Sequence, residues 1–161
     1  MQTNQTTADA TMSLLEAAIR IAVEAHAGQK DKNGQPYILH PLRVMARVQA
    51  DEERIVAILH DVLEDTPWTR AQLEARGFPA LILDALDCVT KRDGENYRDF
   101  VARSASNPIA LRVKLADLED NMDLRRLPKI TPKDQERLSR YLAAYQWLFG
   151  QLREDRAAPK T

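Results

Sequence analysis

Apolar residues recur every three to four positions through most of the chain, which is the spacing of helices that each bury one face. No stretch keeps the strict alternation of apolar and polar residues that a half-buried strand requires. We therefore expect an all-α fold, with short loops that contain proline, glycine or asparagine. The predicted helices cover 13–27, 42–50, 55–65, 69–76, 79–89, 97–104, 109–124 and 131–153.

The segment 55–65, IVAILHDVLED, places four ionisable side chains at the end of an otherwise apolar helix. Residues four positions apart share a helix face, so we expect His60 beside Glu64 and Asp61 beside Asp65. Burying such groups costs free energy unless they have a partner, and neighbouring acids also repel each other. A divalent cation would offset these costs. The alternative is a solvent-exposed helix end with a chance histidine.

A loop upstream of this segment, QKDKNGQPYILHP at 29–41, supplies a second histidine. Asn33 and Gly34 form a tight-turn signal, and Pro41 suits the first turn of the helix that follows. His40 is therefore expected just before a helix begins, where its side chain can point into the centre of a bundle. Lys32 lies on the same loop, either solvated or in contact with a phosphate.

The segment 113–124, VKLADLEDNMDL, supplies a further carboxylate. Asp117 lies between apolar leucines, which makes it the best candidate for an acid that points inward. Asn121 shares its helix face by the four-residue spacing. The other acids of this segment are expected on a solvated flank, balanced by Lys114 and the arginines that follow.

Composition places these motifs in one compact domain. The chain has 161 residues, a net charge of −1 and a pI of about 6.3, so no basic field would attract nucleic acid or a membrane. No apolar run approaches the ~20 residues of a transmembrane helix, and the polar start does not resemble a signal peptide. One cysteine, Cys88, favours a reducing compartment. We expect a cytoplasmic domain over 12–155, with flexible ends at 1–11 and 156–161.

Together, the candidate side chains form a set of nitrogen and oxygen ligands without a thiolate: His40, His60, Asp61 and Asp117. Such a set suits Mn²⁺, Fe²⁺, Co²⁺ or Zn²⁺ and leaves positions open for water and substrate. The spare acids Glu64 and Asp65 indicate hydrolysis, in which the metal lowers the pKa of a bound water. Lys91 and Arg92, in the charged loop 90–96, are solvated or face an anionic ligand.

Three segments resemble the HD-domain phosphohydrolases, and more narrowly the hydrolase domain of the bifunctional alarmone synthetase/hydrolases and the small alarmone hydrolases: GQKDKNGQPYILHPLRV, AILHDVLEDT and VKLADLEDN. The resemblance covers about 22–126. It implies a helical bundle with a metal site between its central helices, and hydrolysis of the 3′-pyrophosphate of ppGpp and pppGpp. It also implies a role for each motif residue: one Mn²⁺ on His40, His60, Asp61 and Asp117, water activation by Glu64 and Asp65, and substrate contact by Asn121.

Two positions depart from the pattern of that family. Its loop usually has an Arg-Lys pair whose arginine stacks on guanine, whereas this chain has Asp31 before Lys32. After the asparagine, the usual Met-Arg-Thr is replaced by Met-Asp-Leu, which places Asp123 where a cation is usual. With Lys32, Lys91 and Arg92 left to hold phosphate, we expect weak or broad activity on ppGpp, or a preference for a less highly charged nucleotide.

Two alternative functions remain open from the sequence. The first is a phosphatase or pyrophosphatase for another nucleotide, such as a nucleoside phosphate or NADPH. The second is a regulatory module that binds a nucleotide without turning it over. Loss of a metal ligand would favour the second, and none is lost.

Overall fold

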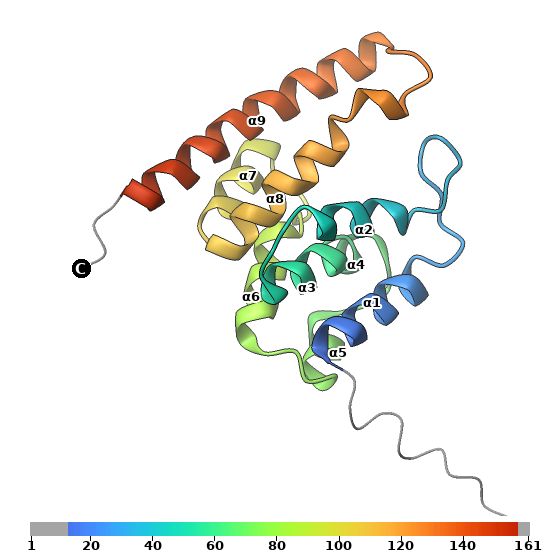
Figure 1. Ribbon diagram of the computed structural model, residues 1–161, viewed down its shortest axis with the longest axis vertical. Helices are drawn as coiled ribbons and strands as arrows, with labels where there is room; N and C mark the ends of the chain where they lie inside the picture. The colour runs from blue at the N-terminus through green and yellow to red at the C-terminus, as the bar shows by residue number, and fades with distance from the viewer. Residues whose placement is uncertain (1–12, 158–161) are drawn as a thin grey trace, which may run out of the picture.

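The computed structural model describes residues 13–157, with side chains as far as Arg153, and its described part is all-α, as predicted. One isolated bridge, between Lys30 and Pro36, is the extended pairing found in that part. Figure 1 shows the helices in order. They are α1 (Leu14–Ala25), α2 (Leu39–Ala46), α3 (Asp51–Leu59), α4 (Val62–Asp65), α5 (Arg70–Ala75), α6 (Ala80–Val89), α7 (Tyr97–Ala105), α8 (Pro108–Asn121) and α9 (Pro132–Ala157).

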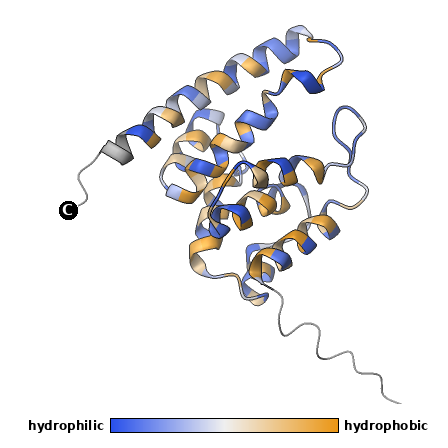
Figure 2. Cartoon of the chain, viewed as in Figure 1, coloured by the Kyte–Doolittle hydropathy of each residue, from blue (hydrophilic) through white to orange (hydrophobic). Residues whose placement is uncertain are grey.

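Local sequence signals set several helix ends. Ser13 and Glu16 form a capping box at the start of α1, because each side chain accepts a hydrogen bond from the other residue's backbone N–H. Thr69 caps α5 in the same way. The loop between α1 and α2 is mostly hydrophilic (Figure 2) and turns at Gly34, whose φ of +76° is a conformation that glycine adopts without strain.

Several predicted boundaries were wrong. The helix predicted over 55–65 is divided, since α3 ends at Leu59 and α4 begins at Val62. The helix predicted over 42–50 begins earlier, so His40 lies in the first turn of α2 rather than before it. The helix predicted over 109–124 ends at Asn121 and is followed by a short 3-10 turn, which the Asp123 side chain caps.

The central element is α8, which packs against α2, α3, α6, α7 and α9 (Figure 1). Ala110, Val113 and Ala116 join a hydrophobic cluster built mainly from α1, α3 and α6. The other face of α8 joins a second cluster with α7 and α9, through Leu111 and Leu118. Because both faces are buried, α8 lacks a single apolar stripe, and polar residues on it are buried as well.

No helix in the described part of the chain is long and apolar enough to span a lipid bilayer. The predicted flexible end at 1–11 lies outside the described residues. Of the predicted tail at 156–161, the first two residues continue α9, and the rest lies outside the described residues.

Candidate metal centre

Two imidazoles and two carboxylates converge where α2, α8 and the α3–α4 turn meet. His40 Nε2 lies 3.6 Å from Asp61 Oδ2 and 3.2 Å from Asp117 Oδ1. His60 Nε2 lies 3.1 Å and 3.6 Å from the same two oxygens. His40, His60 and Asp117 are buried, and Asp61 is partly buried. His40, His60 and Asp61 form a cluster that can hold a metal ion.

Hydrogen bonds to the outer nitrogens orient both imidazoles. His60 Nδ1 lies 2.7 Å from the carbonyl oxygen of Ala57, and a carbonyl can only accept, so Nδ1 carries the proton. His60 Nε2 is buried and has no hydrogen-bond partner in the described structure. His40 Nδ1 likewise lies 2.7 Å from Asp120 Oδ2. Both Nε2 atoms therefore point at carboxylate oxygens, an arrangement that fits a divalent cation with nitrogen and oxygen ligands.

The same arrangement shifts the pKa of the histidines. Burial lowers the pKa of the His60 imidazole, but the Asp61 and Asp117 carboxylates outweigh burial and raise it well above its usual value. The pKa of His40 is also raised, because Asp117 and Asp120 outweigh burial. The site thus favours positive charge between its carboxylates.

Asp120 was predicted to lie on a solvated flank, and this prediction was wrong, since its exposed fraction is 0%. Its carboxylate accepts hydrogen bonds from His40 Nδ1, from Arg43 Nε at 2.8 Å and from Arg47 Nη1 at 2.9 Å. Arg126 also contacts it, at 3.2 Å. The sequence signal was the spacing of three and four between His40, Arg43 and Arg47, which places all three on the face of α2 that meets α8.

Two neighbours hold the Asp117 carboxylate. Lys114, predicted on the solvated flank, is buried, and its Nζ lies 2.8 Å from Asp117 Oδ2. Asn121 Nδ2 donates to Asp117 Oδ1 at 2.6 Å. On the opposite side of the site, the Tyr37 hydroxyl donates to Asp61 Oδ2 at 2.5 Å. Each carboxylate of the cluster is therefore fixed by a side chain other than the histidines.

A cleft of about 520 Å³ opens onto this cluster. Glu64 and Asp65 line it, and burial is the main cause that raises the pKa of both carboxyls. The backbone N–H of Lys91 donates to Glu64 Oε2 at 3.0 Å, and Lys91 also lines the cleft. Arg92 lies beyond the cleft lining, in an adjoining depression that it shares with Glu64.

The opposite wall of the cleft comes from α7 and α9. It includes Tyr97, Arg140 and Tyr141. The Tyr97 hydroxyl is buried and makes no hydrogen bond within the described chain. The Arg140 guanidinium lies over the rings of Tyr97 and Tyr141, 5.4 and 5.9 Å from their centroids. Sequence reasoning missed this wall because tyrosine at helical spacing is usual for a packing face.

The chain was compared with protein-family models, with curated proteins and with solved structures. No protein-family model matches the chain. The guanosine-3′,5′-bis(diphosphate) 3′-pyrophosphohydrolase of Aquifex aeolicus is 37% identical over 120 residues, which are 67% of this chain and 17% of the relative. The bifunctional (p)ppGpp synthase/hydrolase SpoT of Escherichia coli K12 is 33% identical over 141 residues, 78% of this chain and 20% of the relative. The chain is homologous to part of these enzymes.

The chain spans about a fifth of the length of these pyrophosphohydrolase relatives. A solved structure described as a metazoan ortholog of SpoT that hydrolyzes ppGpp shares the fold, with a TM-score of 0.69 and 24% sequence identity. That similarity covers 89% of this chain and 87% of the other. The two chains therefore share the same all-helical fold.

The two acids that depart from the pyrophosphohydrolase pattern border a polar recess of about 320 Å³, which shares Tyr37, His40, Asn121 and Tyr141 with the cleft. Asp31 Oδ1 accepts the backbone N–H groups of Asn33 and Gln35, at 2.8 and 2.9 Å. Asp123 accepts from Arg125 at 2.8 and 2.9 Å. Both acids are thus hydrogen-bonded to nearby residues. Lys32 and Arg137 also line the recess.

Proposed function

We propose that this chain is a metal-dependent phosphohydrolase that removes the 3′-pyrophosphate of ppGpp and pppGpp. One observation carries the proposal: two imidazole Nε2 atoms and two carboxylate oxygens converge within 3.1–3.6 Å beside a cleft. Homology to the guanosine-3′,5′-bis(diphosphate) 3′-pyrophosphohydrolases supports the substrate class.

His40, His60, Asp61 and Asp117 would hold the cation, for which we propose Mn²⁺, with Zn²⁺, Fe²⁺ or Co²⁺ as substitutes. When bound, the ion would activate water and offset the negative charge of the phosphates. The protein prepares the ligands in advance, because Asp120 and the Ala57 carbonyl fix the imidazole tautomers.

Glu64 and Asp65 are proposed to move protons. Hydrolysis joins the oxygen of water to phosphorus and breaks the bond to the ribose 3′-oxygen, which leaves with a proton as the pyrophosphate departs. Burial raises the pKa of both carboxyls, which brings them closer to the range where a group can accept and return a proton near neutral pH. The Lys91 backbone holds Glu64 in place for this role.

The cleft and the recess together suit a nucleotide with several phosphates. Lys91 and Arg140 supply positive charge in the cleft, and Lys32 and Arg137 supply it in the recess. Asn121 lines both spaces and is fixed by its hydrogen bond to Asp117, so we propose that its remaining amide atoms contact the substrate.

The experiment is hydrolysis of ppGpp by the purified chain with added Mn²⁺, with GDP and pyrophosphate resolved by ion-exchange chromatography. Activity should require the metal and should be lost in His60→Ala, together with bound Mn²⁺ measured by atomic emission. Glu119→Gln, at an exposed position on α8, is the matched control and should keep both. Full activity in His60→Ala would contradict the metal site. Robust Mn²⁺ binding without release of pyrophosphate would contradict the alarmone substrate.

A further inference from the structure

A groove of about 410 Å³ runs between α7 and α9, beside the cleft. Tyr97 and Arg140 line both spaces, so these two side chains separate the groove from the cleft. The rest of its lining is largely apolar and includes Val101 from α7 and Trp147 from α9. Trp147 leaves 46% of its surface exposed.

Two arginines line this groove without an acidic partner. Arg98 comes from α7 and Arg140 from α9, and within the described chain neither forms an ion pair with a carboxylate. The contacts of Arg140 are with the faces of aromatic rings, which leave its N–H donors available. An apolar groove with two such guanidiniums has the charge that an anionic ligand requires.

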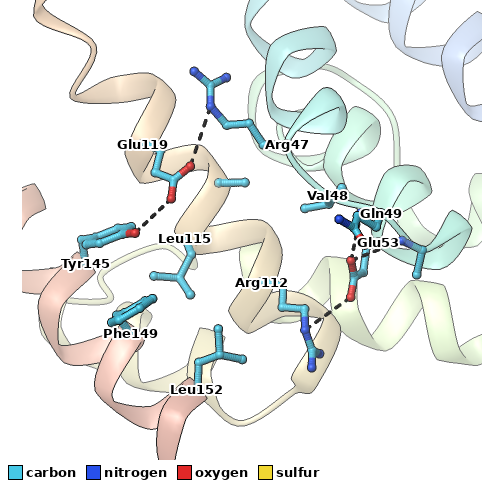
Figure 3. A pocket seen from close by; sticks show the side chains of 12 residues that line it. Arg47, Val48, Gln49, Glu53, Arg112, Leu115, Glu119, Tyr145, Phe149 and Leu152 are labelled. Atoms are coloured by element: carbon cyan, nitrogen blue, oxygen red, sulfur yellow. Dashed lines mark hydrogen bonds and ion pairs between the residues drawn. The ribbon is translucent and has the colours of Figure 1, made fainter. Parts of the chain in front are cut away.

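The pocket in Figure 3, of about 450 Å³ between α8, α9 and the α2–α3 loop, provides a contrast. There Arg47 faces Glu119 at 3.8 Å, and Arg112 faces Glu53 at 3.5 Å. Its positive and negative charges balance, so that pocket gives no preference for a charged ligand. The α7–α9 groove differs in carrying uncompensated positive charge.

The charge and the aromatic surface of the groove lie at opposite ends. Arg98 follows Tyr97 in the first turn of α7, and the Arg140 guanidinium lies over the Tyr97 ring, so both arginines belong to the end of the groove nearest the cleft. Trp147 is seven residues beyond Arg140 on α9, or about 10 Å along the helix axis. A ligand should therefore carry an anionic group at one end and a flat aromatic group about 10 Å away.

We propose that the α7–α9 groove binds a nucleoside 5′-phosphate, with its base against Trp147 and its phosphate on Arg98 and Arg140. Stacking on an indole and pairing with guanidinium groups are the two contacts that this ligand class can make. Because Arg140 also lines the cleft, an occupant of the groove competes with the cleft for that guanidinium. The site does not depend on the proposed hydrolysis.

Tryptophan fluorescence tests the proposal directly. The chain has two tryptophans, so Trp68→Phe leaves Trp147 as the reporter. Titration of this variant with GMP should quench the emission in a saturable way. Adding Arg98→Gln should raise the Kd for GMP roughly tenfold, the effect of about 1.4 kcal/mol from one charge-assisted contact. Arg153→Gln, at an exposed arginine of α9 outside the groove lining, is the matched control and should leave the Kd unchanged.

Guanosine and inorganic phosphate each carry one half of the ligand, and each should bind at least about tenfold more weakly than GMP. Because Arg98 does not line the cleft, a change in the Kd for GMP caused by Arg98→Gln reports binding in the groove and not at the metal centre. The proposal is overturned if millimolar GMP leaves the emission unchanged, or if Arg98→Gln and Arg153→Gln have the same effect. Tighter quenching by decanoate than by GMP would also overturn it, in favour of an aliphatic anion.

Discussion

Replacing Asp120 with asparagine tests the buried charge network behind His40. The substitution keeps the shape of the side chain but removes its charge and puts an N–H donor where a carboxylate oxygen accepts. His40, Arg43 and Arg47 now donate to that carboxylate at 2.7–2.9 Å. We expect Asp120→Asn to lower both stability and metal affinity.

The size of the effect follows from burial. Removing one partner of a buried ion pair costs about 3–5 kcal/mol, because the remaining charge stays desolvated without compensation. Here Asp120 is fully buried, but the Arg43 and Arg47 side chains keep 32% and 28% exposure and can reach water. We therefore expect the lower end of that range, about 3 kcal/mol, which lowers Tm by about 6–12 °C. Loss of the hydrogen bond that orients His40 should weaken metal binding about 10–100-fold.

Urea unfolding and Mn²⁺ titration by calorimetry measure the two effects separately. Glu119→Gln is the control, because it removes the charge of the neighbouring acid. The Glu119 carboxylate is more exposed and lies 3.8 Å from Arg47, which is a weak ion pair. That change should cost less than about 1 kcal/mol and leave Mn²⁺ affinity unchanged. If Asp120→Asn is as stable as Glu119→Gln, the network does not carry the stability assigned to it. If its Mn²⁺ affinity equals that of the wild type, Asp120 does not position His40.

Three further outcomes are expected. Glu64→Gln should lower kcat for ppGpp about 10²–10⁴-fold while Mn²⁺ content by atomic emission stays at the wild-type level. Asp31→Asn keeps the oxygen that accepts the loop N–H groups but removes the charge, so KM for ppGpp should fall about threefold. Asp31→Arg removes that oxygen, so it should lower Tm through loss of the turn. Hydrogen bonds from Arg103 lower the pKa of Glu95 to about 2, from its usual value of 4.5. This pair therefore stabilises the fold fully at pH values above 4.5, and the stabilisation is lost as the pH falls toward 2. The Tm difference between wild type and Glu95→Gln should shrink over that range, and a constant difference would contradict the assignment.

The sequence was sufficient to predict the all-α fold and the residues that converge at the centre. Histidines and acids beside apolar helical positions are costly to bury, so their presence in three separate segments pointed to a shared site. His40, His60, Asp61 and Asp117 do lie together. Helix starts such as the one at Ser13 were predictable because capping depends on neighbouring residues alone.

What the sequence did not reveal depends on contacts between distant segments. Asp120 lies among other acids in the sequence, a pattern that is typical of a solvated helix face. The residues that bind its carboxylate are 73 to 80 positions away, so the local sequence does not reveal them. The break between α3 and α4 was hidden because apolar spacing continues across it into Val62. The aromatic wall from α9 could not be told from a packing face, since Tyr141 serves both purposes.

The two faces of α8 pack into two separate hydrophobic clusters, and these clusters support different helices of the domain. One hydrophobic cluster supports the helices that carry His40, His60 and Asp61, and the other anchors α7 and α9. The cleft lies between these two clusters, so the side that carries His40, His60 and Asp61 and the side formed by α7 and α9 rest on different cores. Under the proposed function, substitutions in α9 would change the α7–α9 wall of the cleft without disturbing the packing beneath His40, His60 and Asp61. If the proposed hydrolysis holds, a lineage could acquire a new substrate by mutating one helix while the metal centre stays intact.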